Sequence, residues 1–337
     1  MLEKYFFQYN TRIFFIIDKK LKNVIKDNFS KCLENPNFIF IYLPVSSRIK
    51  QWKFILTLLD HCQKNHITKN DTIMALGGGN LLDLVGFFAS ILFRGISYFN
   101  IPTTLLAQID AGIGGKCAID AKGVKNIFGS FHQPKQTLIA PPFLTALSNN
   151  KKTIDWGLGE LIKYTFLSKN IYTLVKKRQN FSKIIRACAK YKLQIVQKDF
   201  YDTKQLRIQL NLGHSIGHVL EKMFSLPHGL AVLIGLEWII HLFTSTIHRS
   251  LLLNRFFTLL NLYHLSKEYT KIRDKIHASK INWKKFEELL RSDKKIEGYI
   301  LHLIIPTPQF RFKIKKIHYH RCLEVLKNFY DNTKTIT

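Results

Sequence analysis

Residues 71–86 read Asp-Thr-Ile-Met-Ala-Leu-Gly-Gly-Gly-Asn-Leu-Leu-Asp-Leu-Val-Gly, a short apolar run that ends in three glycines and continues into a second apolar segment. The first run has the length of a buried strand, and the second predicts a helix through Ser90. At such a strand-to-helix turn, Gly77, Gly78 and Gly79 let backbone N–H groups approach a pyrophosphate at the positive helix end. Because the spacing is not G-x-G-x-x-G, a tight turn without a ligand remains the alternative.

The segments before this turn alternate between strand-like and helix-like patterns. Apolar runs at residues 13–17 and 38–42 flank a Lys- and Asn-rich helical segment, and residues 51–65 place apolar side chains at helical spacing. This alternation predicts an α/β domain in which helices cover a parallel sheet.

Polar and cationic residues follow the next predicted strand, which ends near Pro102. The helix after it carries the hydroxyls of Thr103 and Thr104 in its first turn. Residues 112–116 (Gly-Ile-Gly-Gly-Lys), together with Lys125-Asn126, predict a flexible cationic loop, and such loops bind phosphate-bearing ligands. The alternative is that Lys116 is a solvated charge.

The pattern changes after Pro141-Pro142, and from about residue 150 the segments are mainly helical. We therefore expect an α/β domain over residues 1–150 and a mainly helical domain over residues 151–337. Within the second domain, Glu160 and Lys163 share a helix face at i and i+3. The residues alone favour a surface salt bridge for this pair.

Residues 207–218 read Arg-Ile-Gln-Leu-Asn-Leu-Gly-His-Ser-Ile-Gly-His, and Pro227-His228-Gly229 follows. His214 and His218, at i and i+4, lie on one face of a helix, and His228 can return to that face after a short loop. The neighbouring glycines allow close approach of backbone. Three imidazoles in this arrangement indicate a metal site, although each histidine could be an ordinary core or surface residue.

Composition limits the classes of protein to consider. The chain has 337 residues, 46% of them hydrophobic, and carries 51 Lys and Arg against 23 Asp and Glu, a net charge of +28. Residues 267–295 interleave Lys with Glu and Asp and match no nucleic-acid module, so we interpret the charge as a solvated surface and expect no nucleic-acid partner. Apolar runs are too short to span a membrane, no leader pattern is visible, and five cysteines lack paired spacing, which indicates a cytoplasmic protein.

Taken together and in order, these motifs resemble the 3-dehydroquinate synthase family of the shikimate pathway. The resemblance runs from about residue 12 to Pro306, and the family's N-terminal strand pair has no counterpart. It rests on Gly77-Gly78-Gly79…Asp83, Arg94-Gly95, Pro102-Thr-Thr-Leu-Leu106, Gly114-Gly-Lys116, Lys125-Asn126, Gly159-Glu160…Lys163, Leu210-Asn-Leu-Gly-His214…Gly217-His218 and His228-Gly229.

The resemblance implies a lyase (EC 4.2.3.4) that converts 3-deoxy-D-arabino-heptulosonate 7-phosphate to 3-dehydroquinate and phosphate, a step of chorismate and aromatic amino acid biosynthesis. The family binds NAD and a divalent metal, zinc or cobalt, and forms homodimers. In its reaction, NAD transiently oxidises a substrate hydroxyl, phosphate is eliminated, the hydride returns, and an aldol step closes the carbocycle.

The family's functional residues can be carried over to this chain by motif. The resemblance implies Glu160, His214 and His228 as metal ligands, and His218 as a proton-transfer group near the substrate. It implies a group of substrate contacts near the reacting centre: Arg94, Lys116, Asn126, Lys163, Lys192, Arg207, Asn211, and one of Lys294 and Lys295. It implies an NAD surface made of Lys50, Gly77, Gly78, Gly79, Asp83, Thr103, Thr104, Asp110, Lys116, Lys125, Phe143, Leu144, Thr145 and Ala146.

Four positions depart from the family pattern. Leu82 replaces a glycine of the first motif, Val45-Ser46-Ser47 replaces Asp-Gly-Glu, Leu230 replaces a glutamate, and Phe200-Tyr201-Asp202 replaces an acidic cluster. A side chain at residue 82 is expected to crowd the pyrophosphate, and the loss of Asp-Gly-Glu at residues 45–47 is expected to weaken cofactor binding.

Other functions remain open on the sequence. They are a related sugar-phosphate cyclase, a metal-dependent polyol dehydrogenase, and a non-catalytic remnant that binds metal or nucleic acid. The cations Lys163, Lys192 and Arg207 favour a small anionic sugar phosphate, because an uncharged polyol would not need them.

Overall fold

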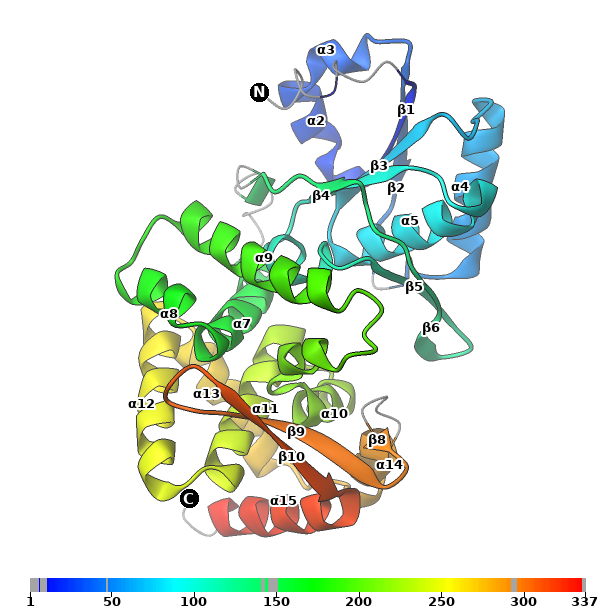
Figure 1. Ribbon diagram of the computed structural model, residues 1–337. Helices are drawn as coiled ribbons and strands as arrows, with labels where there is room; N and C mark the ends of the chain where they lie inside the picture. Colours follow the sequence, from blue (N-terminus) through cyan, green and yellow to red (C-terminus); the bar gives the residue numbers. More distant parts are fainter. Residues whose placement is uncertain are drawn as a thin grey trace. The chain divides into compact units, whose positions relative to one another are not determined.

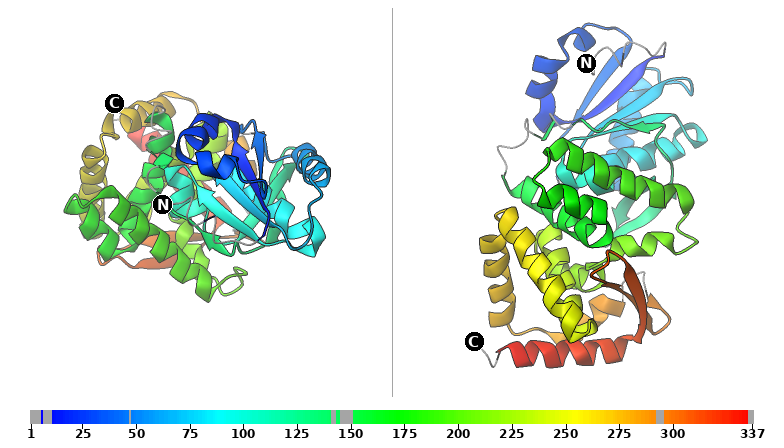
Figure 2. Two further views of the ribbon diagram at one scale, coloured as in Figure 1. Left: turned by 90° about the horizontal axis from the view of Figure 1, so that it is seen from above. Right: turned by 60° about the vertical axis from the view of Figure 1, so that its left-hand side comes forward.

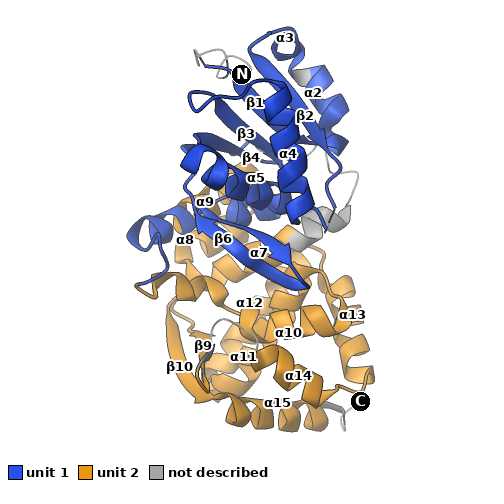
Figure 3. Cartoon of the chain, turned by 90° about the vertical axis from the view of Figure 1, so that its right-hand side faces the viewer, with its two compact units in different colours: residues 1–154, 192–203 blue, residues 155–191, 204–337 orange. Residues whose placement is uncertain are grey.

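The computed structural model describes residue 6 and residues 11–46, 48–140, 143–144, 151–291 and 296–334, and of residues 28, 151–156, 296–297 and 333–334 only the backbone. The chain divides into two compact units (Figure 3). Unit 1 comprises Met1–Ile154 and Lys192–Thr203, and unit 2 comprises Asp155–Tyr191 and Lys204–Thr337. The second segment of unit 1 is the end of helix α9 (Phe181–Lys198) and the loop after it.

Unit 1 is built on a five-stranded sheet, which confirms the predicted parallel sheet (Figure 1). All pairs in this sheet are parallel, and the order is β2-β1-β3-β4-β7. The strands are β1 (Ile13–Asp18), β2 (Phe38–Leu43), β3 (Thr72–Gly77), β4 (Tyr98–Pro102) and β7 (Gln136–Thr137). The order reverses between β1 and β3, and the carboxyl ends of strands at such a point form the usual ligand crevice of open α/β sheets.

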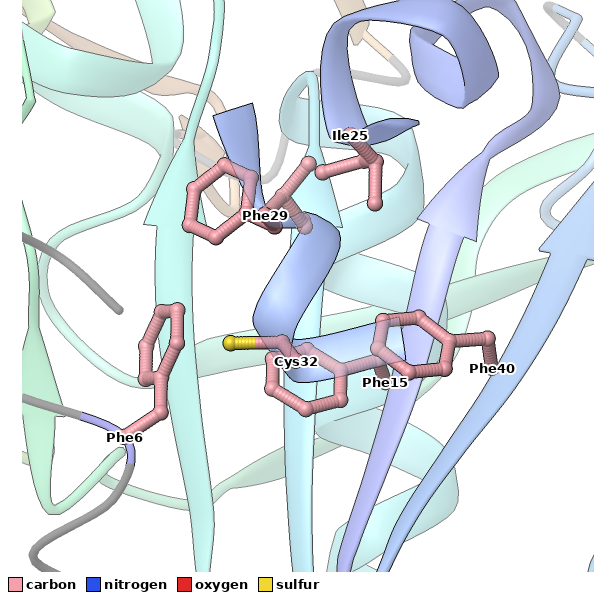
Figure 4. A pocket seen from close by; sticks show the side chains of 7 residues that line it. Phe6, Phe15, Ile25, Phe29, Cys32 and Phe40 are labelled. Atoms are coloured by element: carbon pink, nitrogen blue, oxygen red, sulfur yellow. The ribbon is translucent and has the colours of Figure 1, made fainter. Parts of the chain in front are cut away.

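Helices cover both faces of this sheet because successive strand residues point to opposite sides. Phe14 and Ile16 belong to the core under α4 (Trp52–Lys64) and α5 (Gly79–Ile91). Phe15 belongs to the other core, with the short helices η1 (Lys19–Leu21), α2 (Lys22–Asn28) and α3 (Ser30–Leu33). Figure 4 shows this second core, where the rings of Phe15 and Phe40 stack with centroids 4.9 Å apart.

A β-hairpin replaces the flexible loop that the sequence predicted after residue 115. Strands β5 (Lys116–Ala121) and β6 (Val124–Phe131) pair antiparallel. Lys122 and Gly123 join them with φ angles of +48° and +78°, the pattern of a two-residue type I′ turn. The prediction missed the hairpin because it weighed the glycines before Lys116 and overlooked the Lys-Gly turn.

Unit 2 is mainly helical, as predicted, and carries a three-stranded sheet in the order β10-β9-β8 (Figures 1 and 2). The apolar run 301–305 lies in its central strand, where each side chain is buried. The helices are α7 (Lys151–Leu167), α8 (Lys169–Lys176), the first part of α9, η4 (Leu206–Asn211), α10 (His214–Phe224), α11 (His228–Phe243), α12 (Thr246–Leu262), α13 (Ser266–Ala278), α14 (Trp283–Arg291) and α15 (Tyr319–Lys334); the strands are β8 (Ile296–Glu297), β9 (Ile300–Pro306) and β10 (Phe312–His318).

Among the described helices, none combines the length and the apolar character needed to cross a membrane.

Candidate functional site

Three helices of unit 2 approach one another closely because glycines lie at their contacts. A Cβ atom added at Gly159 of α7 would lie 2.2 Å from the carbonyl oxygen of Gly229 at the start of α11. A Cβ atom at Gly213, which precedes α10 and has φ +78°, would lie 2.5 Å from the carbonyl oxygen of Val232 in α11. Any larger residue would separate these backbones. The glycines thus bring the residues that follow them, Glu160 and His214, beside His228.

Glu160, His214 and His228 meet at one carboxylate oxygen. Glu160 Oε1 lies 3.3 Å from Nε2 of His214 and 3.3 Å from Nε2 of His228. His218 lies one turn along α10, with its ring centroid 5.1 Å from that of His214 and 5.7 Å from that of His228. One nitrogen from each of the three histidines lies within 4.8 Å of the others, so the imidazoles alone also form a candidate metal site.

The distances fit a shared metal ion. Two ligand atoms about 2.1 Å from a tetrahedral zinc ion lie about 3.4 Å apart. The two contacts of Glu160 Oε1, at 3.3 Å, have nearly this separation. Both Glu160 oxygens are buried; Oε2 forms an ion pair with Lys163, and Oε1 faces the two imidazoles. Because a buried carboxylate needs a partner, this donor set suits a divalent cation.

Lys163 is the cation that the described chain itself places at Glu160. Its ammonium forms an ion pair with Oε2 and donates a hydrogen bond of 2.8 Å to the carbonyl oxygen of Leu210. Burial opposes ionisation of Glu160, but the positive charge of Lys163 and the contact with His214 outweigh it and hold the pKa well below its usual value. Lys163 therefore pairs with Oε2 of Glu160, and Oε1 faces His214 and His228.

The second nitrogen of each imidazole has its own acceptor. His214 Nδ1 lies 3.1 Å from the carbonyl oxygen of Leu212, and His228 Nδ1 lies 2.8 Å from Oε2 of Glu221. Burial lowers the pKa of His214 despite the nearby Glu160. Burial also opposes protonation of His228, but the carboxylates of Glu160 and Glu221 outweigh it and raise its pKa to about 10. Glu221 was not among the predicted site residues, although its position seven residues after His214 places it on the same helix face.

Two further described residues of unit 2, Arg207 and Asn211, are implied as substrate contacts. Arg207 is 6% exposed and lies in η4. Asn211 is half-buried at the end of η4, three residues before His214. Lys294 and Lys295 lie outside the described residues.

The glycine turn of unit 1 follows β3 at the reversal of strand order. Gly78 is the N-cap of α5, and a Cβ atom there would lie 3.2 Å from Cγ2 of Thr104. Thr103 is buried and Thr104 is half-buried at the end of β4. The predicted glycines and hydroxyls therefore share one edge of the sheet, at the amino end of a helix, which is a suitable place for an anion.

Lys50 and Asp83 form an ion pair beside this turn. Lys50 is 6% exposed, and its Nζ lies 2.7 Å from Asp83 Oδ2 and donates a short hydrogen bond to the side chain of Asn126. Asp120 accepts a hydrogen bond of 2.8 Å from the backbone N–H of Asn126, which has φ +55°. Burial raises the pKa of Asp83, and the charge of Lys50 opposes that rise.

Two more predicted cations of unit 1 bind carboxylates of the same unit. Lys116 Nζ lies 2.5 Å from Asp202 Oδ2. Lys192 Nζ lies 2.7 Å from Oδ1 of Asp110 and donates a hydrogen bond of 2.7 Å to the carbonyl oxygen of the same residue. Arg94 and Lys125 are exposed, in η2 (Leu92–Arg94) and β6 respectively.

The last predicted positions of the NAD surface, residues 143–146, are only partly described. Phe143 and Leu144 are 5% and 8% exposed, and Thr145 and Ala146 lie outside the described residues. Leu82 is 2% exposed and packs in the core under α4 and α5. Its expected effect on a bound pyrophosphate stays a prediction.

Comparisons with known proteins agree on one family. The family described as 3-dehydroquinate synthase N-terminal matches residues 40–154, and 3-dehydroquinate synthase C-terminal matches residues 157–296. The 3-dehydroquinate synthase of Clostridium tetani is 31% identical over 96% of this chain and 87% of its own length. That of Thermococcus kodakarensis is 36% identical over 67% of this chain and 65% of its own length, just under two thirds.

Solved structures show the same fold at lower identity. The 2-epi-5-epi-valiolone synthase of Streptomyces hygroscopicus subsp. jinggangensis, with NAD⁺ and Zn²⁺ bound, has a TM-score of 0.78 at 22% identity and covers 96% of this chain and 92% of its own. A 2-deoxy-scyllo-inosose synthase complexed with carbaglucose-6-phosphate, NAD⁺ and Co²⁺ also has a TM-score of 0.78, at 18% identity, covering 97% and 94%. An iron-containing alcohol dehydrogenase has a TM-score of 0.56 at 13% identity, covering 97% and 92%.

Proposed function

Because the chain belongs to the 3-dehydroquinate synthase family, whose members are lyases, we propose that it converts 3-deoxy-D-arabino-heptulosonate 7-phosphate to 3-dehydroquinate and inorganic phosphate. The proposal includes NAD and a divalent metal, zinc or cobalt, as cofactors, in line with the two cyclases of similar fold that were crystallised with NAD⁺ and these metals. The single observation that carries it is the meeting of two imidazole nitrogens at one buried oxygen of Glu160, 3.3 Å from each.

Glu160, His214 and His228 would hold the metal, which leaves positions open for substrate. When bound, the metal and NAD supply the acidification of a substrate hydroxyl and the acceptance of its hydride. His218 is half-buried and adjoins both histidine ligands, so it is placed to carry a proton to or from the substrate.

The cations would bind the phosphate and carboxylate of the substrate. In unit 2, Arg207 offers a guanidinium, which matches either anion with two parallel hydrogen bonds. In unit 1, Lys116 and Lys192 now bind carboxylates of Asp202 and Asp110, so an anionic ligand would exchange with these partners. Arg94, Lys163, Asn126, Asn211 and one of Lys294 and Lys295 complete the proposed set of substrate contacts.

NAD would bind at the glycine turn of unit 1. The turn offers backbone N–H groups at the amino end of α5, where the helix dipole favours a pyrophosphate. The proposed surface further includes Lys50, Asp83, Thr103, Thr104, Asp110, Lys116, Lys125 and residues 143–146.

The test is phosphate release from 3-deoxy-D-arabino-heptulosonate 7-phosphate by the purified chain, with and without added NAD and zinc. We expect release that depends on both additions after the protein has been stripped, and we expect the product to be 3-dehydroquinate. Glucose 6-phosphate, which lacks the carboxylate, is the control substrate and should release no phosphate.

Two outcomes would contradict the proposal. Absence of phosphate release by a folded, zinc-loaded protein would exclude the synthase activity. Turnover of glucose 6-phosphate at a similar rate would indicate a related sugar-phosphate cyclase instead.

We further propose a homodimer in the cytoplasm. The dimer is taken from the family resemblance, and the location follows because sugar phosphates and NAD are charged and are retained inside cells. Light scattering during gel filtration would test the dimer, and fractionation of cells that produce the chain would test the location.

A further inference from the structure

Glu221 connects helix α10 to the first residue of α11. Its Oε2 lies 2.8 Å from His228 Nδ1, while His228 Nε2 lies on the other side of the ring, 3.3 Å from Glu160 Oε1. The side chains of Glu221 and His228 are 21% and 26% exposed, so water competes only partly for this contact. Each nitrogen of the His228 ring therefore faces a different carboxylate.

An imidazole can hold a metal with one nitrogen only when that nitrogen carries a lone pair. An acceptor at Nδ1 keeps the proton there and leaves the lone pair on Nε2. For His214 this acceptor is the backbone carbonyl of Leu212, at 3.1 Å, which no side-chain substitution removes. For His228 it is the side chain of Glu221, which can be changed.

We propose that Glu221 is a positioning residue of the metal site, which fixes the ring orientation and the protonated nitrogen of His228 so that Nε2 faces the metal. The inference rests on the proposed function, because it takes Glu160, His214 and His228 as the ligands. The carboxylate also adds negative charge beside the ligand set and so favours a divalent cation.

A purely structural role for Glu221 makes a different prediction. The backbone carbonyl of Glu221 accepts hydrogen bonds from the N–H groups of Ser225 and Leu226 and so ends α10. Substitution of the side chain leaves that carbonyl in place. A structural role of the side chain would appear in the stability of the metal-free protein and would leave the affinity for zinc unchanged in folded protein.

The experiment is a competition titration of the full chain, stripped of metal, with zinc and a chromophoric chelator. The variants are Glu221→Ala, which removes the acceptor, and Glu221→Gln, which keeps an acceptor of the same size without the charge. Lys222→Ala is the matched control, because Lys222 is the next residue of α10 and is exposed. Thermal unfolding of each metal-free protein is recorded alongside.

We expect Glu221→Ala to weaken zinc binding by about 10- to 100-fold, the range found when such acceptors are removed. Glu221→Gln should show a smaller loss, and Lys222→Ala should stay within about twofold. The metal-free melting temperatures of the Gln variant and the parent should agree. If Glu221→Ala does not fold, the Gln variant still decides the question, because it keeps the size and one acceptor atom.

Zinc affinity within twofold of the parent in both Glu221 variants would overturn the inference. His214→Ala separates this failure from a failure of the proposed function. If His214→Ala loses zinc while the Glu221 variants keep it, the metal site stands and the role of Glu221 is wrong. If the parent itself binds no stoichiometric zinc, both proposals fail.

Discussion

The candidate metal centre of unit 2 and the candidate nucleotide surface of unit 1 hold their polar groups in different ways. In unit 2 the proposed ligands lie on helices whose backbones are in close contact, and one oxygen of the buried Glu160 faces the Nε2 atoms of His214 and His228. In unit 1 the predicted cations Lys50, Lys116 and Lys192 already bind carboxylates. In unit 2, Lys163 pairs with one oxygen of Glu160 and the other oxygen faces two imidazoles, whereas in unit 1 each of these cations is paired with a carboxylate.

This difference predicts how each region gains a ligand. The unit 2 cluster presents one carboxylate oxygen and two imidazole nitrogens to a metal ion and needs little reorganisation, because its glycine contacts fix the helices. The unit 1 surface must exchange internal ion pairs for ligand contacts. The exposed Lys116–Asp202 pair contributes below about 1 kcal/mol, whereas Lys50 and Lys192 are buried and their pairs cost more to break. Removal of a proposed metal ligand in unit 2 should therefore abolish metal binding, whereas substitutions in unit 1 should change affinity or stability by smaller amounts.

The largest effect is expected from removal of a metal ligand. His214→Ala leaves the site with two proposed ligands and should abolish stoichiometric zinc and lower kcat by about 10³-fold or more. Zinc content by atomic absorption and phosphate release would measure both losses. NAD binding to unit 1, followed by fluorescence, should be retained; loss of NAD together with zinc would show that the two regions do not act separately.

A smaller effect is expected at Lys116, which we propose to contact the substrate. Lys116→Ala should lower kcat/KM by about 10²-fold, the cost of one electrostatic contact in a transition state. Lys122→Asn is the matched control, because Lys122 is an exposed cation at the turn of the same hairpin and already has a positive φ, which asparagine tolerates. Steady-state kinetics with equal losses in both variants would mean that overall positive charge, not the position of Lys116, attracts the substrate.

The helix contact at Gly159 should be sensitive to one methyl group. Alanine gains about 1 kcal/mol of helix propensity, but its Cβ would lie 2.2 Å from backbone that cannot rotate away. We expect Gly159→Ala to lower the free energy of unfolding by about 2 kcal/mol net and to weaken zinc binding. Ser250→Ala, at an exposed position of α12, is the control for thermal unfolding. An unchanged melting temperature would show that the close contact is not required.

The smallest effect is expected at the Lys50–Asp83 pair of unit 1. Lys50→Met leaves the carboxylate of Asp83 without its nearest cation, which should cost about 1–2 kcal/mol of stability at neutral pH. Burial raises the pKa of Asp83, and loss of Lys50 should raise it further. Because the folded pKa lies above the unfolded one, the penalty grows as pH rises from about 4 through the folded pKa. Thermal unfolding should therefore show a larger deficit at pH 7 than at pH 4, and an equal deficit at both would contradict this assignment.

The sequence predicted the parts of the molecule that follow from local patterns. Strand and helix periodicity predicted the parallel sheet, and the spacing of His214 and His218 predicted one helix face. The residues alone favoured a surface salt bridge for Glu160 and Lys163, yet both side chains are fully buried at the cluster. The spacing of Glu160 and Lys163 in the sequence could not predict their burial, because that burial comes from the packing of α7 on α11 through Gly159 and Gly229.

Three other features were not predicted from the sequence. The hairpin β5–β6 was missed because its turn, Lys122-Gly123, is a weaker signal than Asn-Gly. The burial of Leu82, which packs in the core under α4 and α5 and is 2% exposed, was not predicted either. The internal ion pairs of unit 1 join residues 33 to 86 positions apart, and no pattern in the sequence predicts them.

The most direct test of the central claim is the zinc K-edge X-ray absorption spectrum of the zinc-loaded protein. We predict two imidazole nitrogens and a carboxylate oxygen at about 2.0–2.1 Å, because His214, His228 and Glu160 are the proposed ligands and His218 stays outside the shell. A spectrum that requires three imidazoles would contradict this account, because it would place zinc between His214, His218 and His228 and leave Glu160 to Lys163 alone.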